Sequence, residues 1–157
     1  MDLEVCVLAS GSSGNSIYIA SPKTRILIDA GLSAKQVALR LEQIGVVPES
    51  INGICVSHEH SDHVGGIRVL QKRHGTPVYT NAGTLNGIRR QPKGSEIAVQ
   101  IFQTGSPFTI GDIRVEPFSV PHDAYEPVGF RLQAGSFCVG VVTDLGMSTS
   151  LIQQKLK

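Results

Sequence analysis

The sequence predicts one mixed α/β domain over residues 1–157, and three observations support this prediction. The chain has 157 residues, of which 41% are apolar and 17% charged, an ordinary size and composition for one globular domain. Strand-like and helix-like runs alternate from residue 53 to residue 90, whereas strand-like runs dominate on both sides. From these runs alone we expect one layer of sheet that needs cover on both faces.

Three short strands are expected at the start of the chain, over residues 3–9, 16–20 and 25–29. A polar, glycine-rich loop over residues 10–15 separates the first two. Residues 21–24, with a proline and small polar side chains, suit a tight turn between the second and the third.

A helix is expected after Ser33, a suitable N-cap, with Gly45 as its stop. Its apolar residues fall largely on one side: Val37, Leu39, Leu41 and Ile44. The elements expected next are a strand over 53–57, a helix over 62–74, a strand over 77–80 and a weaker helix over 81–90. Four strands, over 97–102, 113–120, 128–133 and 137–143, and a helical segment over 148–157 complete the chain.

The bulk properties exclude several classes of protein. A net charge of +1 gives no general field that would attract nucleic acid, so any polyanion binding must come from local patches. No stretch approaches the roughly 20 apolar residues that span a bilayer, and the N-terminus lacks a signal-peptide pattern. We therefore expect a cytoplasmic protein with no membrane partner. The cysteines, Cys6, Cys55 and Cys138, each lie in an apolar run, which indicates buried reduced thiols.

The strongest chemical signal is the run Ser57-His-Glu-His-Ser-Asp-His-Val-Gly-Gly66. After an apolar strand, His58 and His60 project to the same side in extended backbone and can bind one metal ion. Asp62 and His63 come from the turn into the next helix and can face a second position nearby. Imidazole and carboxylate ligands suit Zn, Mn or Fe, with Zn favoured by the imidazole content.

Each of these residues also has an ordinary structural explanation. A lone histidine is usually a surface or core residue, and Asp62 alone would be a helix N-cap. The density of the cluster, which holds three of the five histidines, favours a metal site. Gly65 and Gly66 follow the cluster and would let the backbone pack closely behind the ligands.

Further candidates stand at the ends of expected strands. His122 follows a strand, and Asp144 ends an apolar run where an unpaired carboxylate would be costly. Asp29 ends an earlier strand, where a turn residue and a support for the ligands are equally good interpretations. Asp123 and Glu126 are better explained as loop residues.

Together these residues resemble the metallo-β-lactamase superfamily, whose pattern is an early Asp, His-x-His-x-Asp-His, a later His, a bridging Asp and a final His. Asp29, the run 58–63, His122 and Asp144 match the first four elements in order. The resemblance implies an αββα sandwich of the α/β class (α+β in some schemes) and two divalent metal ions. It assigns His58, His60 and His122 to one ion, Asp62 and His63 to the other, and Asp144 to a bridging position. An Asp there, in place of the Cys of zinc β-lactamases, argues against antibiotic hydrolysis.

Four shorter motifs narrow the resemblance to the YycJ/WalJ-like branch of DNA exonucleases. They are the stretch 8–16, the stretch 27–31, Pro121-His-Asp-Ala124 and Thr143-Asp-Leu-Gly146. Members of this branch continue through a further half that holds the last histidine ligand. The resemblance therefore implies that the first half of the fold is present and that the domain is incomplete at its C-terminus. His74 lies too far along its helix to replace that ligand.

By the same resemblance, a metal-bridging hydroxide would attack the phosphorus of a phosphodiester, and Asp62 would orient it and accept its proton. Ser12, Ser13 and Asn15 could contact a substrate phosphate, although a plain polar turn also explains them. Two basic clusters could contact a DNA backbone or simply be solvated: Arg68, Lys72 and Arg73, and Arg89, Arg90 and Lys93.

The sequence is also compatible with two other functions. One keeps the metal ions and hydrolyses a small ester, lactone, thioester or cyclic phosphodiester, because loops rather than ligands select the substrate in such folds. The other is a non-catalytic metal-binding fragment or assembly partner. A homodimer is left open as well.

Overall fold

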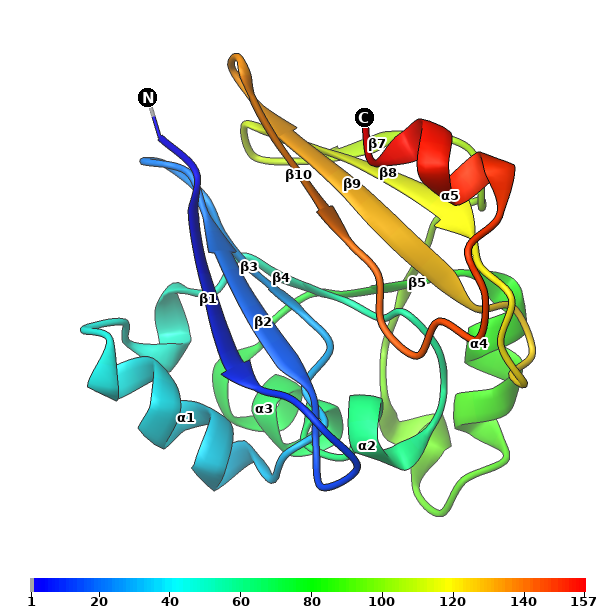
Figure 1. The fold of residues 1–157 in the computed structure, drawn as a ribbon. Coiled ribbons are helices and arrows are strands. Elements are labelled where there is room, and N and C mark those ends of the chain that lie inside the picture. The colour runs from blue at the N-terminus through cyan, green and yellow to red at the C-terminus, as the bar shows by residue number, and fades with distance from the viewer. Residues whose placement is uncertain (1) are drawn as a thin grey trace.

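The computed structural model describes residues 2–157 and shows two β-sheets packed face to face, with helices on the outer side of each sheet (Figure 1). Within these residues the strand order is β1-β2-β3-β4-β5-β6 in the first sheet and β10-β9-β8-β7 in the second. The strands of the first sheet are β1 (Glu4–Ala9), β2 (Ser16–Ala20), β3 (Arg25–Ile28), β4 (Gly53–Cys55), β5 (Val78–Thr80) and β6 (Gln100–Ile101). Those of the second are β7 (Phe108–Ile110), β8 (Ile113–Ser119), β9 (Val128–Ala134) and β10 (Phe137–Val141). The expected αββα sandwich is confirmed, whereas the single sheet layer is wrong.

The later strands form a sheet of their own because they have one strongly apolar face. Ile113 and Val115 of β8 are fully buried, while Arg114 between them is exposed. The two buried residues of β8 belong to one apolar cluster with Ile26 and Ile28 of β3. This cluster fills the space between the sheets. Two sheets that each bury one face against the other form a shared core without a covering helix between them.

The first sheet changes from antiparallel to parallel pairing at β3. Strands β1, β2 and β3 pair antiparallel, and β3 to β6 pair parallel. Parallel neighbours need crossover connections, and these hold α1 (Ala34–Gln43), η1 (Pro48–Ser50), α2 (Ser61–Val64), α3 (Ile67–His74), α4 (Ala82–Arg89) and η2 (Gly94–Glu96). Because parallel strands end at the same edge, the loops after β3, β4 and β5 meet there.

Helix α1 begins and ends as its sequence predicts. The Ser33 side chain accepts a hydrogen bond from the Gln36 N–H, and Gly45 adopts a left-handed conformation (φ 75°) after the last turn. Val37 and Leu41 are buried against the first sheet. The prediction that Leu39 lies on the same apolar side is wrong. Leu39 is 46% exposed, because its position on the helix faces away from the sheet.

The helix expected over residues 62–74 is divided into α2 and α3 at the glycine pair. The Gly66 N–H donates to the Ala30 carbonyl at 2.8 Å instead of continuing one helix. A Cβ at Gly66 would lie 2.2 Å from the Leu32 carbonyl oxygen, so this contact requires glycine. The expectation that the pair lets backbones pack behind the histidines is confirmed.

The remaining differences lie where regular structure is short. The strand expected over residues 97–102 is reduced to the two residues of β6, and β7 was not expected, although the Gly111-Asp112 turn beside it is a hairpin signal. The C-terminal helix is α5 (Ser150–Lys155), whose Ile152 packs with Phe118 and Val120 on the outer face of the second sheet. No helix within residues 2–157 has the length and apolar character needed to cross a membrane.

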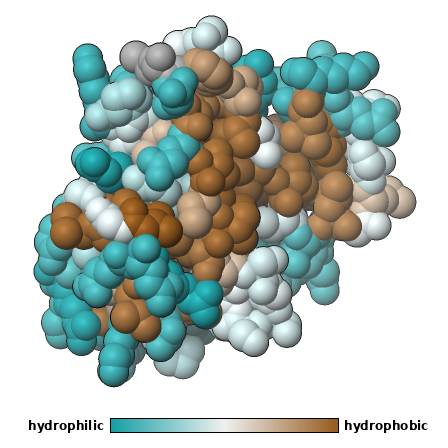
Figure 2. All heavy atoms as spheres, turned by 60° about the vertical axis from the view of Figure 1, so that its left-hand side comes forward, coloured by the Kyte–Doolittle hydropathy of each residue, from teal (hydrophilic) through white to brown (hydrophobic). Residues whose placement is uncertain are grey.

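The edge strands β1 and β10 lie on the same side of the sandwich (Figure 1). Figure 2 shows apolar surface gathered on this side, and Val5, Val7 and Phe137 are 47%, 60% and 45% exposed. All three cysteines are unpaired, but burial is confirmed only for Cys55. Cys6 is half-buried and Cys138 exposed, because β1 and β10 are edge strands.

Replacing Gly31 with alanine should destabilise the fold strongly. A Cβ there would lie 1.6 Å from the Asp62 carbonyl oxygen, so two backbone segments must separate. We expect Gly31→Ala to lower the free energy of unfolding by about 2 kcal/mol or more in urea denaturation. Gly146→Ala is the matched control, since a Cβ at Gly146 meets nothing within 4 Å. Equal stability of the two variants would contradict this packing analysis.

Candidate metal centre

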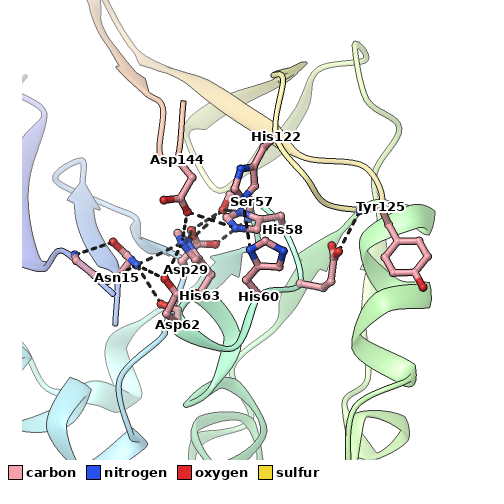
Figure 3. Close-up of polar contacts among 12 residues, drawn as sticks. Asn15, Asp29, Ser57, His58, His60, Asp62, His63, His122, Tyr125 and Asp144 are labelled. Carbon is pink, nitrogen blue, oxygen red and sulfur yellow. Dashed lines mark hydrogen bonds and ion pairs between the residues drawn. The ribbon is translucent and has the colours of Figure 1, made fainter. Parts of the chain in front are cut away.

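The sequence-predicted donors converge at the seam between the two sheets (Figure 3). His58 and His60 lie on the loop after β4, and α2 carries Asp62 and His63. The second sheet supplies two more donors: His122 from the loop after β8 and Asp144 from the segment after β10.

A first group of donors consists of His58, His60 and His122. One ring nitrogen from each lies within 4.8 Å of the others, and the His122 Nε2 and His60 Nδ1 atoms are 3.3 Å apart. Figure 3 shows the three rings turned toward one another, with His122 facing the loop of the first sheet. Three imidazoles at this spacing can hold one divalent ion.

A second group consists of His58, His63 and Asp144. The Asp144 Oδ2 lies 2.6 Å from His63 Nε2 and 3.4 Å from His58 Nε2. His58 therefore belongs to both groups. Asp62 lies beside the second group rather than within it, with its Oδ2 3.5 Å from His63 Nε2.

The carboxylate of Asp29 supports the centre from behind. Its side chain is 1% exposed, and its Oδ1 accepts a hydrogen bond from the Ser57 backbone N–H at 2.7 Å. Its Oδ2 accepts from the Ser57 hydroxyl at 2.6 Å and lies 2.7 Å from His63 Nδ1. Asp29 adopts a left-handed conformation (φ 62°), which aspartate tolerates better than most residues. Of the two interpretations open from the sequence, these contacts favour support for the donors.

Hydrogen bonding assigns the same tautomer to two of the histidines. Because the Ser57 hydroxyl donates to Asp29, the His58 Nδ1, 2.9 Å from Ser57 Oγ, must carry the proton and donate to that oxygen. His63 Nδ1 likewise carries the proton that Asp29 accepts. The Nε2 atoms of both rings therefore face the centre. Ser57 was not predicted from the sequence, although its place directly before His58 was a usable signal.

The histidines differ in how readily they take a second proton. Burial, and then the neighbouring imidazoles with His63 first, lower the pKa of His58 to about 3. Burial also acts to lower the pKa of His63, but the carboxylates of Asp29, Asp144 and Asp62 outweigh it and leave that pKa raised. His58 is therefore neutral at ordinary pH, the state that binds a metal ion.

These residues fit a divalent metal ion. The His58 Nε2 is buried and has no hydrogen-bond partner among residues 2–157. This nitrogen accepts no hydrogen bond and lies among other ring nitrogens and a carboxylate. A metal ion that it ligates would explain why it is buried without a partner.

A cleft of about 480 Å³ opens beside the centre on the side of the glycine-rich loop. Ser12, Asn15, Asp62 and Asp144 line it, whereas Ser13 does not. The Asn15 Nδ2 lies 3.2 Å from both Asp62 Oδ2 and His63 Nε2, so this loop contacts the donors directly.

The other predicted residues lie further away. His74 is paired with Glu49 at 3.3 Å and belongs to neither donor group. Arg68 of the first basic cluster is paired with Glu96, while Arg90 of the second lies over the Tyr125 ring. Glu126 is a loop residue, as expected, and binds the Gly83 N–H at the start of α4.

Comparison with known proteins gives consistent results. The family model of the beta-lactamase superfamily domain matches residues 24–157. The exodeoxyribonuclease WalJ of Streptococcus pneumoniae (serotype 2, strain D39) is 38% identical over 143 residues, 89% of this chain and 53% of that protein. The exodeoxyribonuclease YycJ of Bacillus anthracis is 36% identical over 161 residues, 100% of this chain and 60% of that protein. The chain thus spans about half the length of the curated relatives it matches.

Solved structures show the same fold. A subclass B3 metallo-β-lactamase from a soil metagenome, MEM-A1, superposes with a TM-score of 0.68 at 27% identity, over 82% of this chain and 55% of that one. A metallo-β-lactamase of Cronobacter sakazakii gives a TM-score of 0.72 at 24% identity, over 83% and 57% of the two chains. The fold is thus metallo-β-lactamase-like, and this fold implies divalent metal ions.

In the metal-free chain, the pKa of His58 should make stability depend on pH. Below pH 6.5 the unfolded chain protonates this histidine while the folded chain does not until about pH 3. The free energy of unfolding should therefore fall with decreasing pH across this window, by at most about 1.4 kcal/mol per pH unit. The raised pKa of His63 stabilises the fold in a different pH range. Its contribution to the free energy of unfolding is complete below pH 6.5 and is lost as the pH rises through the pKa of His63 in the folded chain.

Urea denaturation between pH 4 and pH 6.5 tests this dependence. His58→Gln should flatten the slope, because glutamine does not titrate. An unchanged slope in that variant would show that other groups cause it.

Proposed function

The chain belongs to the β-lactamase superfamily, and from this premise we propose that it acts in the metal-dependent hydrolysis of DNA phosphodiester bonds, as an exonuclease. The observation that carries the proposal is the pair of donor groups that share His58 at the seam of the sandwich. The similarity to WalJ and YycJ, both named exodeoxyribonucleases, supports DNA as the substrate.

In this proposal His58, His60 and His122 would hold one ion, Asp62 and His63 would hold the other, and Asp144 would contribute to both. Zinc suits the imidazole-rich set best, with manganese or iron as alternatives. The ions would supply positive charge to stabilise the phosphate and would lower the pKa of a bound water. Asp144 is 2.6 Å from His63 and 3.4 Å from His58, one donor of each set, which supports a contribution of its carboxylate to both ions.

The chain's own groups prepare the attack. Asp62, 27% exposed at the cleft, orients the water and accepts its proton at the carboxylate. Asn15 holds that carboxylate through its Nδ2. Asp29 and Ser57 keep the ring nitrogens of His58 and His63 turned to the centre, as hydrogen-bond partners of metal ligands commonly do.

The surroundings of the centre suit a DNA strand. Ser12 and Asn15 line the cleft where a phosphate would enter. The exposed arginines Arg89 and Arg90 at the end of α4 offer contacts to backbone phosphates. The proposal includes a cytoplasmic location, and a homodimer is compatible with it.

Metal content and nuclease activity test the function. We expect the chain extended to the length of its relatives to bind two divalent ions and to cleave DNA in a reaction that a chelator abolishes, and metal content and activity are measured for this chain beside it. His58→Ala should lose the ion held by His58, His60 and His122 and with it all activity, because the substitution removes one of the three imidazole ligands of that ion. His74→Ala, outside both groups, should keep them. A metal-loaded protein that cleaves small esters but no nucleic acid would refute the proposal.

Asp29→Asn should weaken metal binding without removing a ligand. The amide cannot accept from His63 and Ser57 as the carboxylate does, so the rings lose their fixed orientation. We expect metal affinity to fall by about 10- to 100-fold in competition with a zinc-sensitive dye. Asp112→Asn is the control, because Asp112 accepts its hydrogen bond from Ser21 and belongs to neither donor group. An equal effect of both substitutions would mean that Asp29 has no special role.

A further inference from the structure

A second hollow, of about 410 Å³, lies next to His60 on the far side from the glycine-rich loop. Its lining consists of Glu59, His60, Asp123, Ala124 and Tyr125. Figure 3 shows the Tyr125 ring beyond His60, on the side away from Asp144 and Asn15. His60 is therefore shared between the metal centre and this hollow.

Tyr125 is an exposed aromatic residue on a firmly held backbone. Its side chain is among the large apolar groups left in solvent, with 54% of the residue exposed. Its backbone N–H donates to the Oε1 of Glu59, a residue only 6% exposed, at 3.0 Å. The next residue, Glu126, accepts from the Gly83 N–H at 3.0 Å and from the Thr104 hydroxyl at 2.6 Å. The ring is thus presented by a pinned loop and loses little entropy when it binds a ligand.

Arg90 at the end of α4 extends this surface. Its guanidinium carbon lies 5.5 Å from the centre of the Tyr125 ring, within the range of a cation–π contact. An arginine beside an aromatic ring combines a stacking surface with a donor for a phosphate, the pair of contacts that single-stranded nucleic acid offers.

The hollow itself suits a neutral, flat group with N–H donors. Its lining holds the carboxylates of Glu59 and Asp123 and no lysine or arginine, which disfavours a phosphate inside it. A nucleobase meets these conditions, because it stacks on an aromatic ring and its exocyclic amino group can donate to an exposed carboxylate such as that of Asp123.

We infer that this hollow binds a nucleobase of the DNA strand, with Tyr125 as its stacking platform and Arg90 at a neighbouring phosphate. The inference rests on the proposed DNA hydrolysis and adds to it a base-binding subsite on the opposite side of the metal centre from the phosphate cleft. Tyr125 then determines how tightly a strand binds, and it takes no part in the bond cleavage.

Binding of short single-stranded DNA tests the inference. The metal-loaded protein is titrated into a fluorescein-labelled strand with phosphorothioate linkages, which slow cleavage, and anisotropy gives Kd. Tyr125→Ala should raise Kd about tenfold. Tyr125→Phe, which keeps the ring, should stay within about twofold of the parent. Phe137→Ala, which removes an exposed aromatic residue from β10, should leave Kd unchanged.

A strand with abasic sites in place of its bases separates stacking from contacts to the backbone. On this strand Tyr125→Ala and the parent should bind equally. An unchanged Kd of Tyr125→Ala on the intact strand, or an equal loss on both strands, overturns the inference while leaving DNA hydrolysis standing. If the parent hydrolyses small esters but neither binds nor cleaves DNA, the proposed function fails and the base site with it.

Discussion

The buried carboxylate of Asp29 is the interaction on which the arrangement of the centre depends. A charge with 1% of its side chain exposed would be costly without partners, and here it accepts hydrogen bonds from the Ser57 backbone, the Ser57 hydroxyl and His63. These bonds fix the tautomer of His63 directly and that of His58 through Ser57. The ring nitrogens that face the centre are therefore free to bind a metal ion. One aspartate at the end of β3 thus orients donors that follow β4, because parallel strands end at one edge of the sheet.

The packing of the two sheets sets the distances between the donors. The first sheet and its helices supply His58, His60, Asp62 and His63, and the second supplies His122 and Asp144. Close backbone contacts behind α2, such as the Gly66 N–H to the Ala30 carbonyl, hold the helix against the loop after β3. The apolar cluster between the sheets then keeps both sets of donors at ligand distance. The distances between the donors of the centre therefore depend on how the two sheets pack.

Two recesses with different chemistry flank this centre. The cleft beside Asn15 and Asp62 also contains aspartates and no lysine or arginine, but it adjoins the donors, so bound cations would supply the positive charge that a phosphate needs. The hollow beside His60 offers an aromatic ring and carboxylates, which suits a base. A strand that lies across the centre would meet both, with its scissile phosphate at the seam. Because a nucleic acid would contact both recesses and a simple ester only one, the two recesses would favour a nucleic acid as the substrate.

The sequence by itself determined the class of chemistry and most of the elements, because ligand spacing and helix signals such as Ser33 and Gly45 are local. The αββα architecture came from the resemblance of its motifs, since strand patterns alone do not tell one sheet from two. Only the tertiary structure decided that His58 lies in both donor groups, that Asp29 supports the rings and that Glu59 holds Tyr125. The last two of these contacts join residues from separate segments, 28 positions apart for the Asp29–Ser57 pair and 66 for the Tyr125–Glu59 pair. Such pairs are brought together by the crossover connections and the face-to-face packing of the sheets, which no local pattern records.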